Sequence, residues 1–288
     1  MGDDRPALDI QTPTGTSDLI PRLEALLDDF CPFAVEQLDA VTRRIHFFSR
    51  EDRNHARQAI EHSLGMKGVT TASVEVADED WAQRSQANLT AIRIGEIIVA
   101  PPWALSVASK DAVVVVIRPS MGFGTGHHAS TRLCLQAIQT LTVTNCTVLD
   151  LGTGSGVLAI AAAKLGAKSV VAVEADQDAA ETARENVRLN KVSNLVNVRH
   201  DDFRNAHDLI PAATVLVNIS AGLVYQNAVR LARLVASGGT LIVGGFTALE
   251  EVDVRRVLQP HGGIAARFAE EEDKEAWVTL MFRPPSVA

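Results

Sequence analysis

The sequence predicts an α/β protein in two parts: a large, mostly parallel sheet with helices on both faces, preceded by a smaller α+β unit. The first observation is periodicity, because apolar segments of strand length alternate with segments of helix length from about residue 121 onward. The second is a glycine-rich turn, DLGTGSG at 150–156, between an apolar strand and a helix. The third is a different element order, β-α-β-β-α-β, in residues 1–77.

Residues 1–77 are expected to fold as the smaller unit. The expected strands and helices, in chain order, are strand 7–11, helix 17–30, strands 33–39 and 42–48, helix 50–64 and strand 69–76. This order is that of the ferredoxin-like unit. Residues 78–120 are predicted to be an interdomain linker with bridging strands. The linker contains a short helix near 78–89 and strands at 92–100 and 112–120, separated by a Pro101-Pro102 turn.

Residues 121–288 are expected to form the larger domain. The predicted strands are 146–151, 169–174, 195–200, 213–218, 240–245 and 276–282. The predicted helices lie near 130–141, 156–165, 177–190, 221–236 and 248–259. The last strand alternates in polarity and follows an acidic loop at 270–275, so an antiparallel insertion is one interpretation of it.

Composition and charge narrow the class of protein. The chain of 288 residues is 47% hydrophobic, contains no apolar run of 18 residues, and begins with a polar segment that carries no secretory signal. Its three cysteines fit neither a disulfide framework nor a zinc pattern, so we expect a cytoplasmic protein. The first 80 residues hold 16 acidic and 8 basic residues, whereas the remainder holds 19 of each. Such an acidic front end disfavours nucleic acid and favours a basic protein partner; a merely solvated acidic face is the alternative.

The glycine turn at 150–156 predicts the class of ligand. Gly152, Gly154 and Gly156 allow the backbone to approach a ligand closely, at the carboxyl end of a predicted strand. Position 157 is valine, where a dinucleotide fingerprint requires its third glycine. The wider turn, with Asp150 just before it, suits S-adenosylmethionine better than NAD.

Polar residues at two further strand ends are candidates for the same site. Glu174 follows Gly152 by 22 residues and can accept hydrogen bonds from ribose hydroxyls; the alternative is a surface acid that caps helix 177–190. Asn218 ends an apolar strand, and its amide oxygen can accept hydrogen bonds from an incoming amine. A buried asparagine that only satisfies backbone groups is the alternative there.

The adenine end of the ligand has candidates of its own. Asp201 and Asp202 follow strand 195–200, where either can accept a hydrogen bond from an adenine amino group. Acids at a helix N-terminus also occur without any ligand, so both interpretations stand.

A second glycine-rich segment, SMGFGTGHHAST at 120–131, supplies the remaining candidates. Gly124, with the glycines on either side of it, permits close approach, and Phe123 can stack on a ring. Thr131 begins a helix, from which its hydroxyl can contact a cofactor carboxylate. The pair His127-His128 lacks further ligands at metal-binding spacing, so no metal site is predicted.

Taken together, FGTGHHAST, DLGTGSG, Glu174 and NISAGLV at 218–224 resemble the PrmA family in type and order. PrmA proteins are class I methyltransferases that modify protein eleven of the large ribosomal subunit. The resemblance extends over almost the whole chain, including the tract DEDWAQRSQANLTAIRIGEIIVAPPW. It implies a seven-stranded Rossmann-like sheet with an N-terminal ferredoxin-like domain that recognises the substrate. It also implies that Thr131, Gly152, Glu174 and Asn218 contact the methyl donor, with Asn218 facing the acceptor nitrogen.

The sequence departs from the family pattern in two places. The usual loop is FGTGTHPTT, whereas here histidine replaces threonine at 127 and Ala129-Ser130 replaces Pro-Thr. Glu174 stands where aspartate is common, which conserves an acid for holding a diol. Donor binding is still expected, but the loop changes leave the acceptor open.

The predicted function is therefore S-adenosylmethionine-dependent N-methylation of lysine side chains or the N-terminal amine of a basic ribosomal protein by a cytoplasmic monomer. A methyltransferase acting on another basic protein or on RNA is the main alternative. RNA is disfavoured by the acidic front end and by Phe47 and Phe48, which face opposite sides of one strand. An NAD(P)-linked oxidoreductase is disfavoured by Val157, and the altered loop motivates a non-catalytic binding protein.

Overall fold

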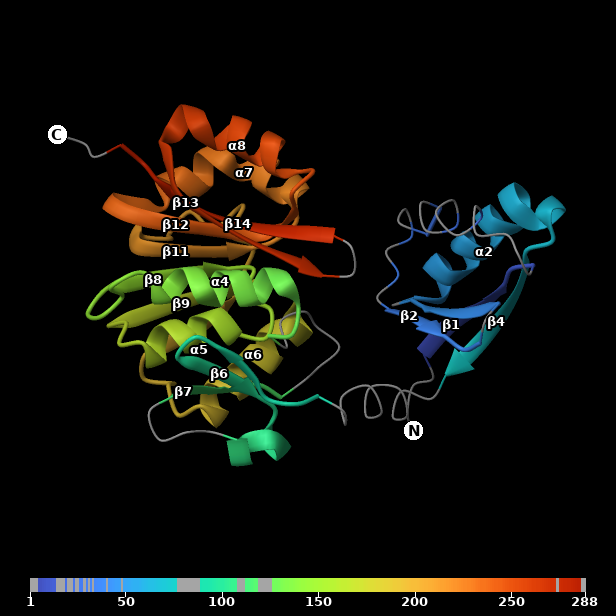
Figure 1. The fold of residues 1–288 in the computed structure, drawn as a ribbon, viewed down its shortest axis with the longest axis horizontal. Helices are drawn as coiled ribbons and strands as arrows, with labels where there is room; N and C mark the ends of the chain where they lie inside the picture. Colours follow the sequence, from blue (N-terminus) through green and yellow to red (C-terminus); the bar gives the residue numbers. More distant parts are fainter. Residues whose placement is uncertain are drawn as a thin grey trace. The chain divides into compact units, whose positions relative to one another are not determined.

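The structure is a computed structural model. It describes residues 5–13, 19, 23, 26–27, 30, 32, 34–39, 41–47, 49–76, 89–107, 112–118, 126–272 and 275–285. The chain divides into two compact units, residues 1–88 and 89–288 (Figure 1). The predicted short helix near 78–89 and most of the predicted helix 17–30 lie outside the described residues. No helix in the described parts of the chain is both long and apolar enough to cross a membrane.

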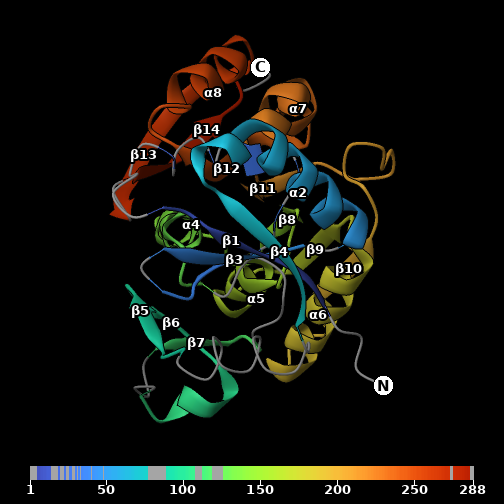
Figure 2. The same ribbon diagram turned by 90° about the vertical axis from the view of Figure 1, so that its right-hand side faces the viewer.

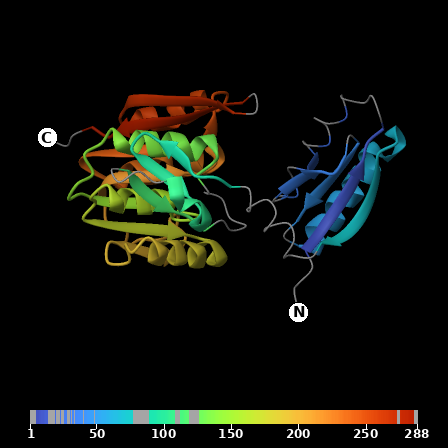
Figure 3. The same ribbon diagram turned by 60° about the horizontal axis from the view of Figure 1, so that its bottom comes forward.

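The first unit is a four-stranded antiparallel sheet with the order β2-β3-β1-β4. Its elements are β1 (Arg5–Gln11), β2 (Ala34–Gln37), β3 (Thr42–His46), α2 (Arg50–Leu64), the 3₁₀ helix η2 (Gly65–Lys67) and β4 (Thr70–Val76). Helix α2 lies against the sheet (Figures 1 and 3). The order is ferredoxin-like, as predicted. Leu8, Ile45, Phe47 and Ile60 belong to its core, together with Leu23 from the segment 17–30.

The second unit is built on a seven-stranded sheet with the order β10-β9-β8-β11-β12-β14-β13. Its strands are β8 (Thr147–Leu151), β9 (Ser169–Glu174), β10 (Val196–His200), β11 (Ala212–Asn218), β12 (Val235–Thr247), β13 (Gly263–Glu272) and β14 (Glu275–Arg283). Strands β10 to β12 are parallel neighbours, whereas β14 runs antiparallel between β12 and β13. The predicted antiparallel insertion at the end of the chain is confirmed.

The predicted acidic loop at 270–275 is wrong for its first three residues, because Glu270, Glu271 and Glu272 end strand β13. That strand is absent from the elements expected along the sequence. Its alanines and glutamates have low strand propensity, but continuous pairing with β14, as between Glu271 and Ala276, overrides this local preference. Side chains along β13 alternate between exposed and half-buried, as expected of an edge strand with one covered face.

Helices cover both faces of this sheet (Figure 1). They are α4 (Ala129–Gln139), α5 (Val157–Lys164), α6 (Gln177–Leu189), α7 (Ala221–Arg233) and α8 (Glu251–Leu258), followed by the 3₁₀ helix η4 (Gln259–His261). Buried side chains of α4, α5 and α6 share one core with the sheet, and those of α7 and α8 share another. Two separate cores on opposite faces are the arrangement of a doubly wound sheet.

A small sheet of three strands packs on the first of these cores (Figure 2). It consists of β5 (Ile92–Ile94), β6 (Ile97–Ala100) and β7 (Val113–Val116), with the 3₁₀ helix η3 (Pro102–Val107) after β6. The single strand predicted at 92–100 is therefore divided in two by a turn at Gly95, whose φ is +59°. The Lys164 ammonium at the end of α5 donates a hydrogen bond to the Val114 carbonyl at 2.5 Å. This bond ties the small sheet to the main domain.

Replacing Phe47 by alanine is expected to destabilise the first unit. Phe47 is among the largest fully buried side chains, and truncating a buried phenylalanine costs about 3–5 kcal/mol. Calorimetric or urea unfolding of the Phe47→Ala variant measures the loss. Val35→Ala, at an exposed position of β2, is the control and should change stability by less than about 0.5 kcal/mol. Equal stability of the two variants would contradict the assigned core.

Candidate functional site

A cavity of about 450 Å³ opens at the carboxyl edge of the large sheet, where β8, β11 and β12 end. Four segments contribute to it: the start of α4, the glycine turn after β8, the segment joining β11 to α7, and the start of β14. The lining residues are His128, Ser130, Thr131, Gly152, Thr153, Gly154, Val157, Leu158, Asn218, Ile219, Ser220, Leu223, Gly245 and Trp277. Among these described residues there is no aspartate, glutamate, lysine or arginine. The cavity is therefore largely apolar, with a few polar groups to orient a ligand.

The glycine turn adopts a conformation that other residues rarely reach. Gly152 has φ +72° and Gly154 has φ +54°. A Cβ on Gly152 would lie 2.8 Å from the Ile219 Cγ2 atom, so the turn also lacks space for a side chain there. The Gly152 and Thr153 amides donate to the Val173 carbonyl at 2.9 and 3.1 Å. These contacts hold the turn open towards the cavity.

Asp150 supports the turn from within the protein. Its Oδ2 atom accepts hydrogen bonds from the Thr153 hydroxyl at 2.5 Å and from the Ala159 amide of α5 at 3.0 Å. The residue is 1% exposed, and burial raises the pKa of its carboxyl to about 7 against the lowering effect of these bonds. Asp150 is not among the lining residues. Its assignment to cofactor binding stays a prediction.

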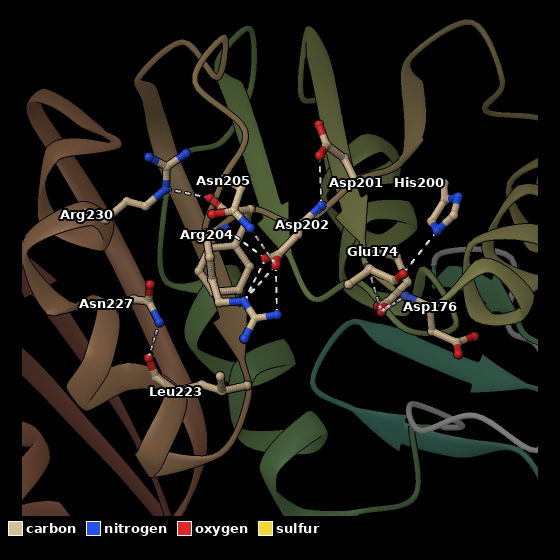
Figure 4. A network of polar contacts seen from close by, with 12 residues as sticks. Glu174, Asp176, His200, Asp201, Asp202, Arg204, Asn205, Leu223, Asn227 and Arg230 are labelled. Carbon is tan, nitrogen blue, oxygen red and sulfur yellow. Dashed lines mark hydrogen bonds and ion pairs between the residues drawn. The ribbon is translucent and has the colours of Figure 1, made fainter. Parts of the chain in front are cut away.

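Glu174 ends β9 beside the glycine turn (Figure 4). Its Oε2 atom accepts a hydrogen bond from the Gly154 amide at 2.8 Å, and its Oε1 atom accepts from the Ala175 and Asp176 amides at 3.0 and 3.1 Å. Because each carboxylate oxygen can accept more than one hydrogen bond, capacity remains for ribose hydroxyls. The structure thus brings Glu174 to the turn, and its role towards a ribose stays a prediction.

Asp202 caps a tight turn after β10 (Figure 4). Its Oδ1 atom accepts from the Arg204 amide at 2.9 Å, and its Oδ2 atom accepts from the Asn205 amide group at 3.2 Å. The Arg204 guanidinium, 2.7 Å away, lowers the pKa of Asp202. Asp201 instead pairs with Arg199 at 2.7 Å. Neither aspartate lines the cavity, so the adenine contact stays a prediction for both.

Thr131 and Asn218 are brought together from positions 87 residues apart. The Asn218 Nδ2 atom donates to the Thr131 hydroxyl at 3.3 Å. The Asn218 Oδ1 atom is buried and has no hydrogen-bond partner among the described residues. An orphaned buried acceptor beside a cavity indicates that a ligand completes the site. The open turn, the cavity and this free acceptor together fit S-adenosylmethionine and an amine.

Several site residues were not predicted, and two predicted ones cannot be placed. Phe123 and Gly124 lie outside the described residues. Trp277, at the start of β14, lines the cavity, and its ring meets the His128 ring edge-on with centroids 4.3 Å apart. Burial lowers the pKa of His128 and so favours the neutral ring. Nothing in the linear sequence connects 277 to 128, because antiparallel pairing of Trp277 with Thr247 brings it to the edge.

An ion-pair cluster fixes the start of α4. The Arg132 guanidinium pairs with Glu270 at 2.6 Å and with Glu272 at 2.9 Å, and it also bonds the His127 carbonyl. Glu272 accepts a further hydrogen bond from the Ala129 amide at 2.8 Å. This cluster holds the helix turn that carries Thr131. Among the described residues, no group of histidine, cysteine and acidic side chains is arranged to hold a metal ion.

The fold and the site together define a class. A doubly wound sheet with an antiparallel β14 between β12 and β13, an open glycine turn after β8 and an acid at the end of β9 are the features of a class I methyltransferase that uses S-adenosylmethionine.

Comparison with known proteins names the family. The family model for ribosomal protein L11 methyltransferase (PrmA) matches residues 27–284. The ribosomal protein L11 methyltransferase of Geobacillus kaustophilus is 34% identical over 251 residues, covering 84% of this chain and 78% of the relative. That of Desulfitobacterium hafniense is 35% identical over 224 residues, covering 77% and 69%.

A solved structure gives the same result. The ribosomal protein L11 methylase of Lactobacillus delbrueckii subsp. bulgaricus aligns with 26% identity and a TM-score of 0.61, covering 68% of this chain and 100% of that one. The chain belongs to the ribosomal protein L11 methyltransferase (PrmA) family. The resemblance drawn from the sequence is thereby confirmed, and with it the methyl donor.

The raised pKa of Asp150 predicts a pH dependence of stability. An aspartate of pKa near 3.9 in the unfolded chain and about 7 in the folded protein binds more protons when folded between these values. Its contribution to the free energy of unfolding therefore falls as pH rises through this window, by at most about 1.4 kcal/mol per pH unit. Asp150→Asn cannot ionise and removes this contribution.

Urea unfolding of both proteins between pH 5 and 8 measures the effect. The stability of the wild type relative to Asp150→Asn should decline as pH rises towards 7 and become constant above it. A difference between the two proteins that is independent of pH would contradict the assigned ionisation.

Proposed function

We propose that this chain transfers methyl groups from S-adenosylmethionine to amine nitrogens of ribosomal protein L11, on lysine side chains or at its N-terminus. The observation that carries the proposal is the orphaned Asn218 amide oxygen, which lies beside a cavity of donor size at the carboxyl edge of the sheet. The names of the relatives support the substrate, since both of those described above are L11 methyltransferases.

The donor is assigned to the cavity between the glycine turn and α4. Gly152 and Gly154 would present backbone to it, Thr131 would contact its carboxylate, and Glu174 would hold its ribose. The sequence assigns Phe123, Gly124, Asp150 and Asp202 to the same ligand. When bound, S-adenosylmethionine supplies a methyl group already activated on a sulfonium. The protein's task is then to align the acceptor and exclude water.

Asn218 is assigned to the acceptor amine. Only a neutral amine has a free lone pair, yet a lysine amine in water has a pKa near 10.4. The apolar side chains of Ile219, Leu223 and Trp277 disfavour the charged form and so lower this pKa. A reduction to about 7 corresponds to about 4 kcal/mol. The Asn218 oxygen would accept an N–H of the amine and leave the lone pair for the methyl group.

The acidic first domain is assigned to docking of the substrate. We place the domain at 1–77, the linker with its bridging strands at 78–120 and the methyltransferase domain at 121–288. L11 as a basic partner would be attracted by the excess of 16 acidic over 8 basic residues in the first 80. The same charge repels nucleic acid, so no direct binding to RNA is expected. A cytoplasmic monomer fits this assignment.

Asn218→Ala is expected to reduce methyl transfer about 100-fold, as when one transition-state hydrogen bond is lost. Donor affinity should change less than threefold, because other contacts hold the donor. Intact mass of purified L11 after incubation with S-adenosylmethionine measures transfer, with increments of one methyl each, and calorimetry measures donor binding. The matched control is Asn227→Ala, since the Asn227 amide only donates to the Leu223 carbonyl on α7 (Figure 4).

Two results would contradict these assignments. Equal losses of transfer and donor binding in Asn218→Ala would remove the acceptor role of this residue. Donor binding by the wild type without any methylation of L11 would exclude L11 as the acceptor. The same assay on whole-cell lysate would then reveal another basic protein or RNA.

Docking through charge predicts a salt dependence. Raising ionic strength from 0.05 to 0.3 M shortens the Debye length to below about 8 Å and weakens attraction between exposed charges. The KM for L11 should therefore rise several-fold, because rim charges act mainly on encounter. Donor affinity, set in a cavity without carboxylates or basic side chains, should stay constant. A KM that is insensitive to salt would argue against docking by the acidic domain.

A further inference from the structure

Two asparagines on α6 hold the outer edge of β7. Asn190, which caps the helix, accepts a hydrogen bond from the Val116 amide at 2.8 Å and donates to the Val116 carbonyl at 2.6 Å. Asn186, one turn earlier, accepts from the Arg118 amide at 2.9 Å. Because β7 pairs with β6 alone among the described strands, these side chains supply the partners that another strand would provide.

Only Asn186 also reaches the glycine turn. Its Nδ2 atom donates to the Ser155 carbonyl at 2.9 Å. Ser155 stands between Gly154, which lines the cavity, and Gly156, which caps the start of α5. One side chain therefore joins the turn to the end of β7, after which the chain enters its second glycine-rich segment.

The packing of α6 shows that this contact is close and rigid. A Cβ on Gly156 would lie 3.5 Å from the Ala183 Cβ atom, so small side chains bring the helix directly against the turn. Asn186 is 0% exposed. A buried amide is unfavourable unless it is hydrogen-bonded, and alanine suits a helix interior better than asparagine. The asparagine thus serves the two backbone groups it joins, not the helix.

We propose that Asn186 is a positioning residue for the methyl donor: it fixes the Ser155 carbonyl, and with it the glycine turn, relative to the end of β7. The inference rests on the proposed donor site. A turn already held in its binding conformation loses little conformational freedom when the donor binds, and this raises affinity. Without the bond, the backbone of Thr153 and Gly154 can move away from the donor while α6 remains folded.

The test compares Asn186→Asp with Asn190→Asp. Each variant keeps an oxygen for its β7 amide and replaces a donating amide by a carboxyl oxygen on the same helix face. Both residues are nearly buried, at 0% and 7% exposure, so similar losses of thermal stability are expected. Only Asn186→Asp breaks the bond to the turn. Its Kd for S-adenosylmethionine, measured by calorimetry, should rise about tenfold, equivalent to about 1.4 kcal/mol.

Asn190→Asp should change this Kd less than about threefold. In the transfer assay, Asn186→Asp should raise the KM for the donor and leave kcat at saturating donor almost unchanged, the pattern of lost binding without lost chemistry. Equal changes of Kd in the two variants, or none in Asn186→Asp, would overturn the inference.

The alanine pair, Asn186→Ala and Asn190→Ala, makes the same comparison without a buried charge and decides the matter if the aspartate variants do not fold. Absence of donor binding by the wild type overturns the donor site itself, and this inference with it. Donor binding without methylation of L11 contradicts only the proposed acceptor, because the Kd comparison still judges Asn186.

Discussion

The conformation of the glycine turn is the constraint on which the rest of the site depends. Positive φ angles at Gly152 and Gly154 expose backbone to the cavity, but such a turn is soft unless other groups hold it. Three side chains do so from different directions. Asp150 joins it to α5, Glu174 joins it to β9, and Asn186 joins it to β7 through Ser155. The donor site is therefore rigid because three separate elements meet at one turn.

Polar groups are unevenly placed around the cavity, and this separates binding from chemistry. The carboxylates of Asp150 and Glu174 are occupied by backbone amides and a hydroxyl, so they stabilise the turn whether or not a ligand is present. The Asn218 oxygen, by contrast, has no partner among the described residues. An unpaired acceptor is costly in the folded protein. It is retained at the one strand end where an amine can complete it.

The sequence was sufficient for features that are local in the chain. Strand and helix periodicity predicted both sheets, and the glycine spacing with Glu174 predicted the ligand, because these patterns lie within about 25 residues of one another. Features made by distant segments escaped prediction. Trp277 reaches the cavity only through pairing with Thr247, and β13 is a strand only because β14 lies beside it. The bonds of Asn186 likewise join positions 68 and 31 residues away.

The apolar lining also implies where selection of the acceptor takes place. A cavity without carboxylates among its described residues offers an amine desolvation and one amide oxygen, and any lysine side chain of sufficient reach satisfies both. Discrimination among lysines must then come from contacts outside the cavity, as specificity is a difference between binding free energies. Charge is available for this in the first 80 residues, where acidic residues outnumber basic ones two to one. In the proposed function, methyl transfer and substrate choice thus rest on different parts of the chain, so substitutions can change one without the other.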